Sequence, residues 1–218
     1  MIACCIFDLD GVIVDTAKYH YLAWAELARA LGFEFTPEQG EATKGVSRMA
    51  SLDIVLRAGG MENRFSAEEK ERLAAEKNAR YLEYITRMTA DEVLPGVLEF
   101  LLGLKAAGIQ VVLGSASKNA GVILDRCGLR QLFDHVVDGT LVSKAKPDPE
   151  VFAKGAELAG QAPAACVVFE DAAAGIAAAA RAGMRSVGGG GSPLLDKATM
   201  QLPTFEGFTF EKLCNQID

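Results

Sequence analysis

The sequence predicts an α/β protein in which a parallel-sheet, Rossmann-like core carries an inserted all-helical cap domain. The run Cys5-Ile6-Phe7 is apolar on both faces, as expected of a buried parallel strand. From residue 95 onward, strand patterns alternate with helix patterns, which favours a parallel sheet covered by helices. The stretch 16–91 shows no strand pattern. We therefore expect residues 1–15 and 92–218 to form the core and residues 16–91 to form the helical cap.

The core elements are expected in a regular order after Pro95-Gly96, which restarts the alternation. Strands are expected at Gln110–Leu113, around Val136-Val137, at Cys166–Phe169 and at Arg185–Val187. Helices are expected to end near Gly108 and Gly128, to begin at Asp148 with Pro149 in the first position, and to span 172–182. The run Gly188–Gly191 is expected to be a surface loop.

Two helices of the cap carry clear end signals. Thr16 is a candidate N-cap for a helix that runs to about Leu31 and stops at Gly32. Ser66 and Glu69 have the spacing of a capping box for a long helix that reaches about Met88.

The composition excludes several kinds of partner and site. Of the 218 residues, 50% are hydrophobic, and the net charge is −7, so no general attraction to nucleic acid or an anionic membrane is expected. The chain shows no signal-peptide pattern and no apolar run of membrane-spanning length. The five cysteines form no C-x-x-C pair and there are two histidines, which disfavours a zinc site. We expect Cys4, Cys127 and Cys166 to be buried free thiols in a cytoplasmic protein.

Asp8 and Asp10 follow the first apolar strand directly. The carboxyl end of a parallel strand opens into the crevice where α/β sheets bind ligands, and alternation along the chain points both carboxylates to one side. Two close carboxylates require a cation, usually Mg²⁺, and one of them can act as a nucleophile while the other moves a proton. The alternative is an acidic pair at the start of a surface loop.

Three further polar clusters follow three other expected strands. The run Ser115–Asn119 opens a helix, so it can hold a phosphate or simply cap that helix. Lys146 precedes a proline, which holds its backbone extended; it is either a fixed cation or a solvated lysine. Glu170 and Asp171 can complete a Mg²⁺ site with Asp8, or can be acids favoured by a helix dipole.

Taken together, these clusters give the chain a clear resemblance to the haloacid dehalogenase superfamily of phosphotransferases. The four motifs of that family match, in order, Asp8-Leu9-Asp10-Gly11, Ser115, Lys146-Pro147 and Glu170-Asp171. The resemblance implies that Asp8 is a nucleophile that forms an aspartyl-phosphate and that Asp10 is a general acid and base. It also implies a Mg²⁺ ion held by Asp8, the carbonyl of Asp10 and Asp171, with support from Glu170. Ser115 and Lys146 would hold the transferring phosphoryl group.

The insertion resembles the helical cap of the β-phosphoglucomutase subfamily. The matching stretches are Asp15–His20 with Trp24, Lys44–Arg48 with Ser51-Leu52, and Glu76–Asn78 with Tyr81. The resemblance implies that substrate and phosphate are bound by Thr16, His20, Trp24, Gly45, Val46, Ser47, Arg48, Lys77, Ser115, Ala116, Ser117, Lys118, Asn119 and Lys146. Arg48 with Ser117, Lys118 and Asn119 would hold the phosphate that is not transferred. One departure is Ala172-Ala173-Ala174, where a serine often follows the two acids.

Residue spacing alone also draws attention to two cap residues. His20 shares a helical face with Trp24, Leu27 and Leu31, so it is expected on the buried side of its helix. Lys77 lies on the apolar face of its own helix, where a lysine needs a partner or a cleft. The alternatives are a packed, hydrogen-bonded histidine and a lysine whose ammonium reaches water.

The two resemblances imply a Mg²⁺-dependent isomerase that interconverts β-D-glucose 1-phosphate and glucose 6-phosphate. The reaction would pass through a bound glucose 1,6-bisphosphate, which also serves as primer. The first alternative is a Mg²⁺-dependent sugar-phosphate phosphatase with the same nucleophile. The second is a catalytically silent binding protein, which the intact set of polar motifs disfavours. The expected partner is a small sugar phosphate, with no nucleic acid and no membrane, and the chain is expected to be a monomer.

Overall fold

The structure is a computed structural model that describes residues 1–43, 46–190 and 195–217. The chain divides into two units, and each is described here by itself. The α/β unit comprises Met1–Asp15 and Met88–Asp218, and the helical unit comprises Thr16–Arg87. The return to the α/β unit therefore falls at residue 88, whereas the sequence placed it at residue 92.

Within the described residues, the α/β unit contains one parallel sheet of six strands in the order β3-β2-β1-β4-β5-β6. The strands are β1 (Cys4–Phe7), β2 (Gln110–Gly114), β3 (His135–Val137), β4 (Cys166–Glu170), β5 (Arg185–Gly189) and β6 (Met200–Leu202). The predicted parallel sheet is confirmed. Gly188 and Gly189 belong to β5, so the loop expected from residue 188 was wrong for these two residues.

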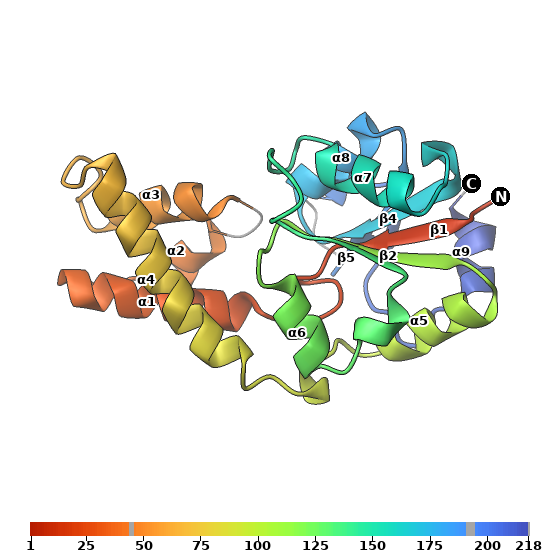
Figure 1. Cartoon of the computed structure of the whole chain (residues 1–218), viewed down its shortest axis with the longest axis horizontal. Helices are drawn as coiled ribbons and strands as arrows, with labels where there is room; N and C mark the ends of the chain where they lie inside the picture. The colour runs from red at the N-terminus through yellow and green to blue at the C-terminus, as the bar shows by residue number, and fades with distance from the viewer. Residues whose placement is uncertain (44–45, 191–194, 218) are drawn as a thin grey trace. The chain divides into compact units, whose positions relative to one another are not determined.

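Helices cover both faces of this sheet. They are α5 (Val97–Ala106), α6 (Ala120–Arg126), α7 (Glu150–Leu158), α8 (Ala173–Arg181) and α9 (Phe210–Gln216), with short 3₁₀ helices at Ala90–Glu92, Arg130–Leu132 and Pro163–Ala165. Figure 1 shows α7 and α8 on one face of the sheet and α5 and α9 on the other. Pro149 occupies the N-cap position of α7, one residue outside the place predicted for it, while Asp148 Oδ1 accepts a hydrogen bond from Glu150 N.

The core of the α/β unit is packed against the central strand β1. On one face, the rings of Phe7 and Phe169 stack with centroids 4.6 Å apart, and Phe100 meets Phe169 edge to face. On the other face, Ile6 is fully buried in a cluster with Phe152 of α7. Because β1 is buried on both faces, its register with β2 and β4 is tightly specified. This fixes where the residues that follow each strand emerge.

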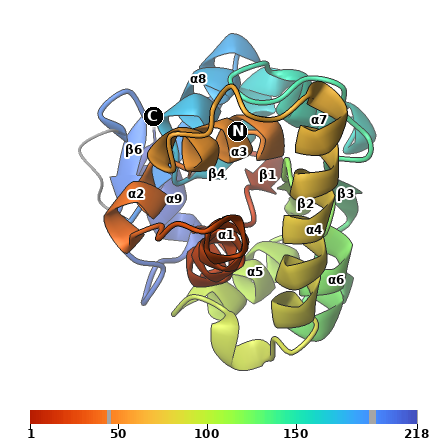
Figure 2. The same cartoon turned by 90° about the vertical axis from the view of Figure 1, so that its left-hand side faces the viewer.

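The helical unit contains α1 (Ala17–Leu31), α2 (Pro37–Glu41), α3 (Arg48–Ala58) and α4 (Ala67–Ile85). Its described residues include no strand, as expected, and Figure 2 shows α4 as the long helix beside α1. The capping box is confirmed, because Ser66 Oγ accepts from Glu69 N and Glu69 Oε2 accepts from Ser66 N. Helix α4 ends at Ile85, three residues before the end that was predicted at Met88. The core of this unit is built on Trp24, Leu27, Leu52, Val55 and Leu73.

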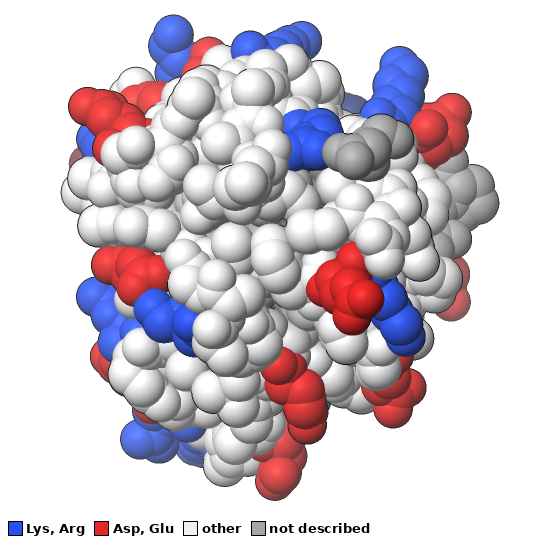
Figure 3. All heavy atoms as spheres, turned by 90° about the vertical axis from the view of Figure 1, so that its right-hand side faces the viewer, with Lys and Arg blue, Asp and Glu red and all other residues white. Residues whose placement is uncertain are grey.

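Two surface properties bear on possible partners. On the face shown in Figure 3, Lys and Arg are interspersed with Asp and Glu, so neither sign of charge dominates it. None of the helices in the described part of the chain combines the length and apolar character needed to span a bilayer.

Candidate active site

Three carboxylates meet at the carboxyl ends of two neighbouring strands. Asp8 follows β1, Glu170 is the last residue of β4, and Asp171 comes next. Phe7 of β1 is paired with Phe169 of β4, and Asp8 N donates to Phe169 O at 2.9 Å. The segments that continue from the two strands therefore leave the sheet side by side. One oxygen from each of the three carboxylates lies within 4.8 Å of the other two. The sheet thus produces an acidic cluster that the strand positions predicted.

Two glycines allow these carboxylates to approach one another. Gly11 has a φ of +77°, which favours glycine, and a Cβ added there would lie 2.0 Å from an Asp171 carboxylate oxygen. A Cβ added at Gly175, in the first turn of α8, would lie 1.6 Å from Glu170 Oε1. A side chain at either position would therefore force the neighbouring carboxylate to move. Gly11 was part of the predicted motif, whereas Gly175 was missed; its only signal was a glycine among alanines.

Lys146 is the cationic partner of the acidic cluster. Its Nζ lies 2.5 Å from Asp8 Oδ1 and 3.1 Å from Glu170 Oε1, and it also stands 4.8 Å from the centre of the Phe152 ring. Burial disfavours the ammonium, but the carboxylates of Asp8 and Glu170 outweigh that effect and raise the pKa of Lys146. Lys146 is therefore a fixed, buried cation rather than a solvated lysine.

The acidic cluster carries more negative charge than one lysine balances. Burial, followed by repulsion from Asp8, raises the pKa of Glu170 to about 8. The same two causes, in the same order, raise the pKa of Asp171 to about 7, with Asp10 adding to the repulsion. Carboxylate oxygens are the ligands that Mg²⁺ prefers, and a divalent cation would relieve this repulsion. The donor set therefore fits a magnesium ion.

Asp10 stands apart from this cluster. Within the described residues, its carboxylate is not one of the group whose oxygens lie within 4.8 Å of one another. It nevertheless acts on Asp171 through its charge, so it is close to the site. Its side chain can serve a proton-transfer role without being a ligand of the same ion.

The loop after β2 carries Ser115, which is 1% exposed. Ser115 Oγ accepts from Ser117 N at 3.1 Å, and Ser117 Oγ accepts from Asn119 N at 3.2 Å. The backbone N–H groups of Ser117 and Asn119, which could otherwise bind a phosphate, thus donate hydrogen bonds within the loop itself. Gly139, which follows β3, contacts this loop, because its N–H donates a hydrogen bond to Ser117 O. A Cβ at position 139 would meet the carbonyl oxygen of Ala116. Ala116 and Lys118 are exposed and Asn119 is half-buried.

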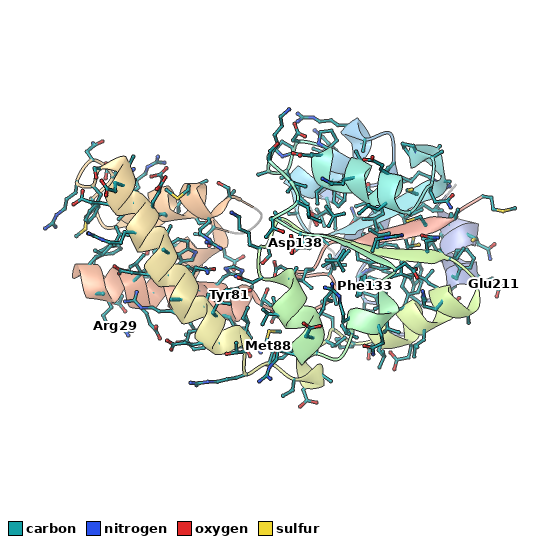
Figure 4. All side chains as sticks on the ribbon, viewed as in Figure 1. Arg29, Tyr81, Met88, Phe133, Asp138 and Glu211 are labelled. Carbon is teal, nitrogen blue, oxygen red and sulfur yellow. The ribbon has the colours of Figure 1, made fainter. Side chains whose placement is uncertain are left out.

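A second polar group lies inside the helical unit. Lys77 is 3% exposed, and its Nζ lies 2.8 Å from His20 Nδ1. The same ammonium stands over the rings of Trp24 and Tyr81, 4.7 and 4.8 Å from their centres. Figure 4 labels Tyr81 on α4, and its ring stacks on His20 with centroids 4.1 Å apart. The prediction that Lys77 needs a partner on its apolar face is confirmed.

The charges around His20 determine its protonation state. Burial, then the charges of Lys77 and Arg48, lower the pKa of His20 well below its ordinary value. The imidazole is therefore neutral near pH 7, and its Nδ1 can accept a hydrogen bond from the Lys77 ammonium.

Arg48 begins α3 and is half-buried. Its Nη2 donates to Asn78 Oδ1 at 2.8 Å, which ties α3 to α4. Burial lowers the pKa of the guanidinium, but arginine stays charged in proteins. Ser47 is the N-cap of α3 through a bond from Ala50 N to Ser47 Oγ.

The other predicted binding residues fall in different environments. Val46 and Ser47 are exposed, and Thr16 is fully buried at the N-cap position of α1. Gly45 lies outside the described residues. The predicted residues are thus divided between the two units. In the α/β unit the structure brings together Asp8, Lys146, Glu170 and Asp171. In the helical unit it brings together His20, Trp24 and Lys77.

Comparisons with known proteins identify similar chains. The haloacid dehalogenase-like hydrolase family matches residues 2–183. A β-phosphoglucomutase of Bacillus subtilis (strain 168) is 43% identical over 191 residues, which cover 87% of this chain and 84% of that protein. The fructose-1-phosphate phosphatase YqaB of Escherichia coli (strain K12) is 34% identical over 188 residues, which cover 84% of this chain and 93% of that protein.

The comparison with solved structures also finds a β-phosphoglucomutase. The crystal structure of a β-phosphoglucomutase from Clostridium difficile superposes with a TM-score of 0.93 at 41% sequence identity. The match covers 100% of this chain and 97% of that chain.

Proposed function

Since this chain belongs to the haloacid dehalogenase-like hydrolases and, within them, to the β-phosphoglucomutase subfamily, we propose that it interconverts β-D-glucose 1-phosphate and glucose 6-phosphate. The observation that carries the phosphoryl-transfer part is the buried cluster of Asp8, Lys146, Glu170 and Asp171. The choice of sugar phosphate rests on the similarity to β-phosphoglucomutases over most of the chain.

Asp8 is the proposed nucleophile. It is 7% exposed, it stands at the end of the central strand, and its carboxylate contacts the Lys146 ammonium. Attack by Asp8 on the phosphorus of a sugar phosphate would break its bond to the sugar oxygen, which leaves as a hydroxyl, and would form an aspartyl-phosphate. Lys146 and Ser115 would hold the phosphoryl oxygens. Asp10 would take a proton from the attacking sugar hydroxyl and return it to the leaving one.

The carboxylates of Asp8 and Asp171 would hold a Mg²⁺ ion, with Glu170 in support and with the Asp10 carbonyl, whose role rests on the family resemblance. When bound, the ion would supply positive charge that offsets the three carboxylates and polarises phosphoryl oxygens.

A mutase must bind a second phosphate while it transfers the first. Arg48 is the proposed group for this purpose in the helical unit, because a guanidinium can grip a phosphate with two parallel hydrogen bonds. Its bond to Asn78 holds the guanidinium in place before a ligand arrives. Ser117, Lys118 and Asn119 are the proposed groups in the α/β unit. Glucose 1,6-bisphosphate would be the intermediate and the primer.

A sugar-phosphate phosphatase is the second candidate, because a fructose-1-phosphate phosphatase is 34% identical to this chain. The deciding experiment supplies the protein with Mg²⁺, β-D-glucose 1-phosphate and a trace of glucose 1,6-bisphosphate. Glucose 6-phosphate and free phosphate are then measured together. Glucose 6-phosphate in large excess supports the mutase, whereas free phosphate as the main product supports the phosphatase.

A further inference from the structure

The loop that carries Lys146 is closed by a single carboxylate on the surface of the α/β unit. Glu150, the first residue of α7, accepts hydrogen bonds from Ser143 N at 3.0 and 3.1 Å, one to each oxygen. It also accepts from Lys144 N at 2.7 Å and from Ser143 Oγ at 3.1 Å. The two backbone donors lower the pKa of Glu150, so these are charge-assisted bonds at neutral pH.

Lys146 occupies the centre of the loop that Glu150 closes. Asp148 N donates to Ala145 O at 3.0 Å, so Lys146 and Pro147 are the two central residues of a four-residue turn. The turn is therefore held internally by this bond and at its base by the Glu150 carboxylate. From this turn the Lys146 side chain reaches inward to Asp8 and Glu170.

We infer that Glu150 is a positioning residue for Lys146, which acts by holding loop 143–150 so that the ammonium meets the phosphoryl group on Asp8. This inference rests on the proposed function. The sequence alone would class Glu150 as an ordinary acid in the first turn of a helix, favoured by the helix dipole. The hydrogen bonds that Glu150 accepts from Ser143 and Lys144 give it a second role.

The rate of phosphoryl transfer depends on where the Lys146 ammonium is held. A lysine side chain is flexible, so the position of its ammonium depends on where its backbone is held. A displacement of about 1 Å in a positioned group can lower a rate by as much as 10²-fold. Glu150→Ala should therefore slow phosphorylation of Asp8 by about tenfold, an order-of-magnitude expectation for partial loosening of the loop.

The test measures phosphorylation of Asp8 by acetyl phosphate in the presence of Mg²⁺, a reaction that does not depend on the identity of the sugar. The variants are Glu150→Ala, Glu150→Gln, Lys146→Ala and the double variant Glu150→Ala/Lys146→Ala. Glu157→Ala is the matched control, because Glu157 is an exposed acid on the same helix and its loss changes the net charge equally. Thermal unfolding and Mg²⁺ affinity are measured for each variant.

We expect the rate of Asp8 phosphorylation to be low in Glu150→Ala, intermediate in Glu150→Gln and equal to the wild-type rate in Glu157→Ala. Mg²⁺ affinity should be unchanged in all three variants. We also expect Glu150→Ala to add no further loss once Lys146 is alanine, because its effect passes through that ammonium. A fast Glu150→Ala variant, or losses that multiply in the double variant, would overturn the inference. A wild type that takes no phosphoryl group from acetyl phosphate would instead overturn the proposed function, and the role of Glu150 with it.

Discussion

The Nζ atom of Lys146 lies 2.5 Å from Oδ1 of Asp8, although 138 residues separate the two in the chain. Both side chains are nearly buried, with 8% and 10% of their surfaces exposed. Because removal of one partner of a buried ion pair leaves an uncompensated charge, Lys146 is expected to affect stability as well as the proposed catalysis.

Lys146→Ala should destabilise the metal-free protein by about 3 kcal/mol, because it leaves Asp8 and Glu170 as buried like charges without their cation. Mg²⁺ should restore part of that loss by supplying charge to the same carboxylates. Urea unfolding with and without Mg²⁺ measures both effects, and Lys197→Ala, which removes an exposed lysine from the α/β unit, is the control. A loss no larger than that of the control would show that the ion pair contributes little to stability.

Gly175→Ala should weaken Mg²⁺ binding strongly. The added methyl group would collide with Glu170 Oε1, so the Glu170 side chain must move away from the cluster or α8 must shift. Gly103→Ala is the control, because a Cβ there meets nothing within 4 Å, and it should leave binding intact while stabilising α5 by up to about 1 kcal/mol. Calorimetric titration with Mg²⁺ provides the measurement. Equal affinity in the two alanine variants would mean that Glu170 does not need its present position.

Mg²⁺ binding should depend on pH, with the sign set by the raised pKa values of Glu170 and Asp171, about 8 and about 7. A carboxyl group whose folded pKa is raised favours folding at low pH, and that contribution is lost as the pH rises through the folded value. Metal-free protein should therefore lose stability between about pH 5 and pH 8, and Mg²⁺ should restore it. The increase in melting temperature on adding Mg²⁺ should thus be larger at about pH 8.5 than at about pH 6. In Asp171→Asn, the increase in melting temperature on adding Mg²⁺ should depend less on pH. An increase in the wild type that is the same at both pH values would contradict this prediction.

Arg48→Ala should damage the mutase reaction more than phosphorylation of Asp8 by acetyl phosphate. Loss of a charge-assisted clamp on the non-reacting phosphate can cost about 10²-fold through misorientation, whereas the small donor has no second phosphate to hold. Arg57→Ala removes an exposed arginine from the same helix and should leave both rates unchanged. Equal losses on both substrates would assign Arg48 to folding or to the transfer step instead.

The sequence predicted the acidic cluster of the α/β unit because the carboxyl ends of parallel strands lie at one edge of a sheet. Asp8 follows β1, Glu170 ends β4 and Asp171 comes next, and the two strands are neighbours, so strand assignment alone brings the three together. Strand β6 was missed, because Met200–Leu202 is short and has neither β-branched residues nor clear alternation. The end of α4 was placed too late because residues 86–94 contain no glycine or proline to mark it.

Contacts made by side chains across loops were harder to predict. The bonds from Ser143 and Lys144 to Glu150 depend on a turn whose conformation no periodic pattern describes. The need for glycine at position 175 depends on where the Glu170 side chain lies, which the sequence does not specify. His20 and Lys77 were each noticed for their helical faces, but only the packing of α1 on α4 shows that they contact each other.

The proposed role of Asp8 is tested most directly by locating the phosphoryl group on the enzyme during turnover. The reaction with β-D-glucose 1-phosphate, Mg²⁺ and a trace of glucose 1,6-bisphosphate is quenched with acid, and the modified peptide is identified by mass spectrometry after reductive trapping. A phosphoryl group is expected on Asp8, and none in a folded Asp8→Asn variant, whose turnover should be abolished because an amide is a poor nucleophile. Phosphate on another residue, or substantial turnover by the asparagine variant, would contradict it.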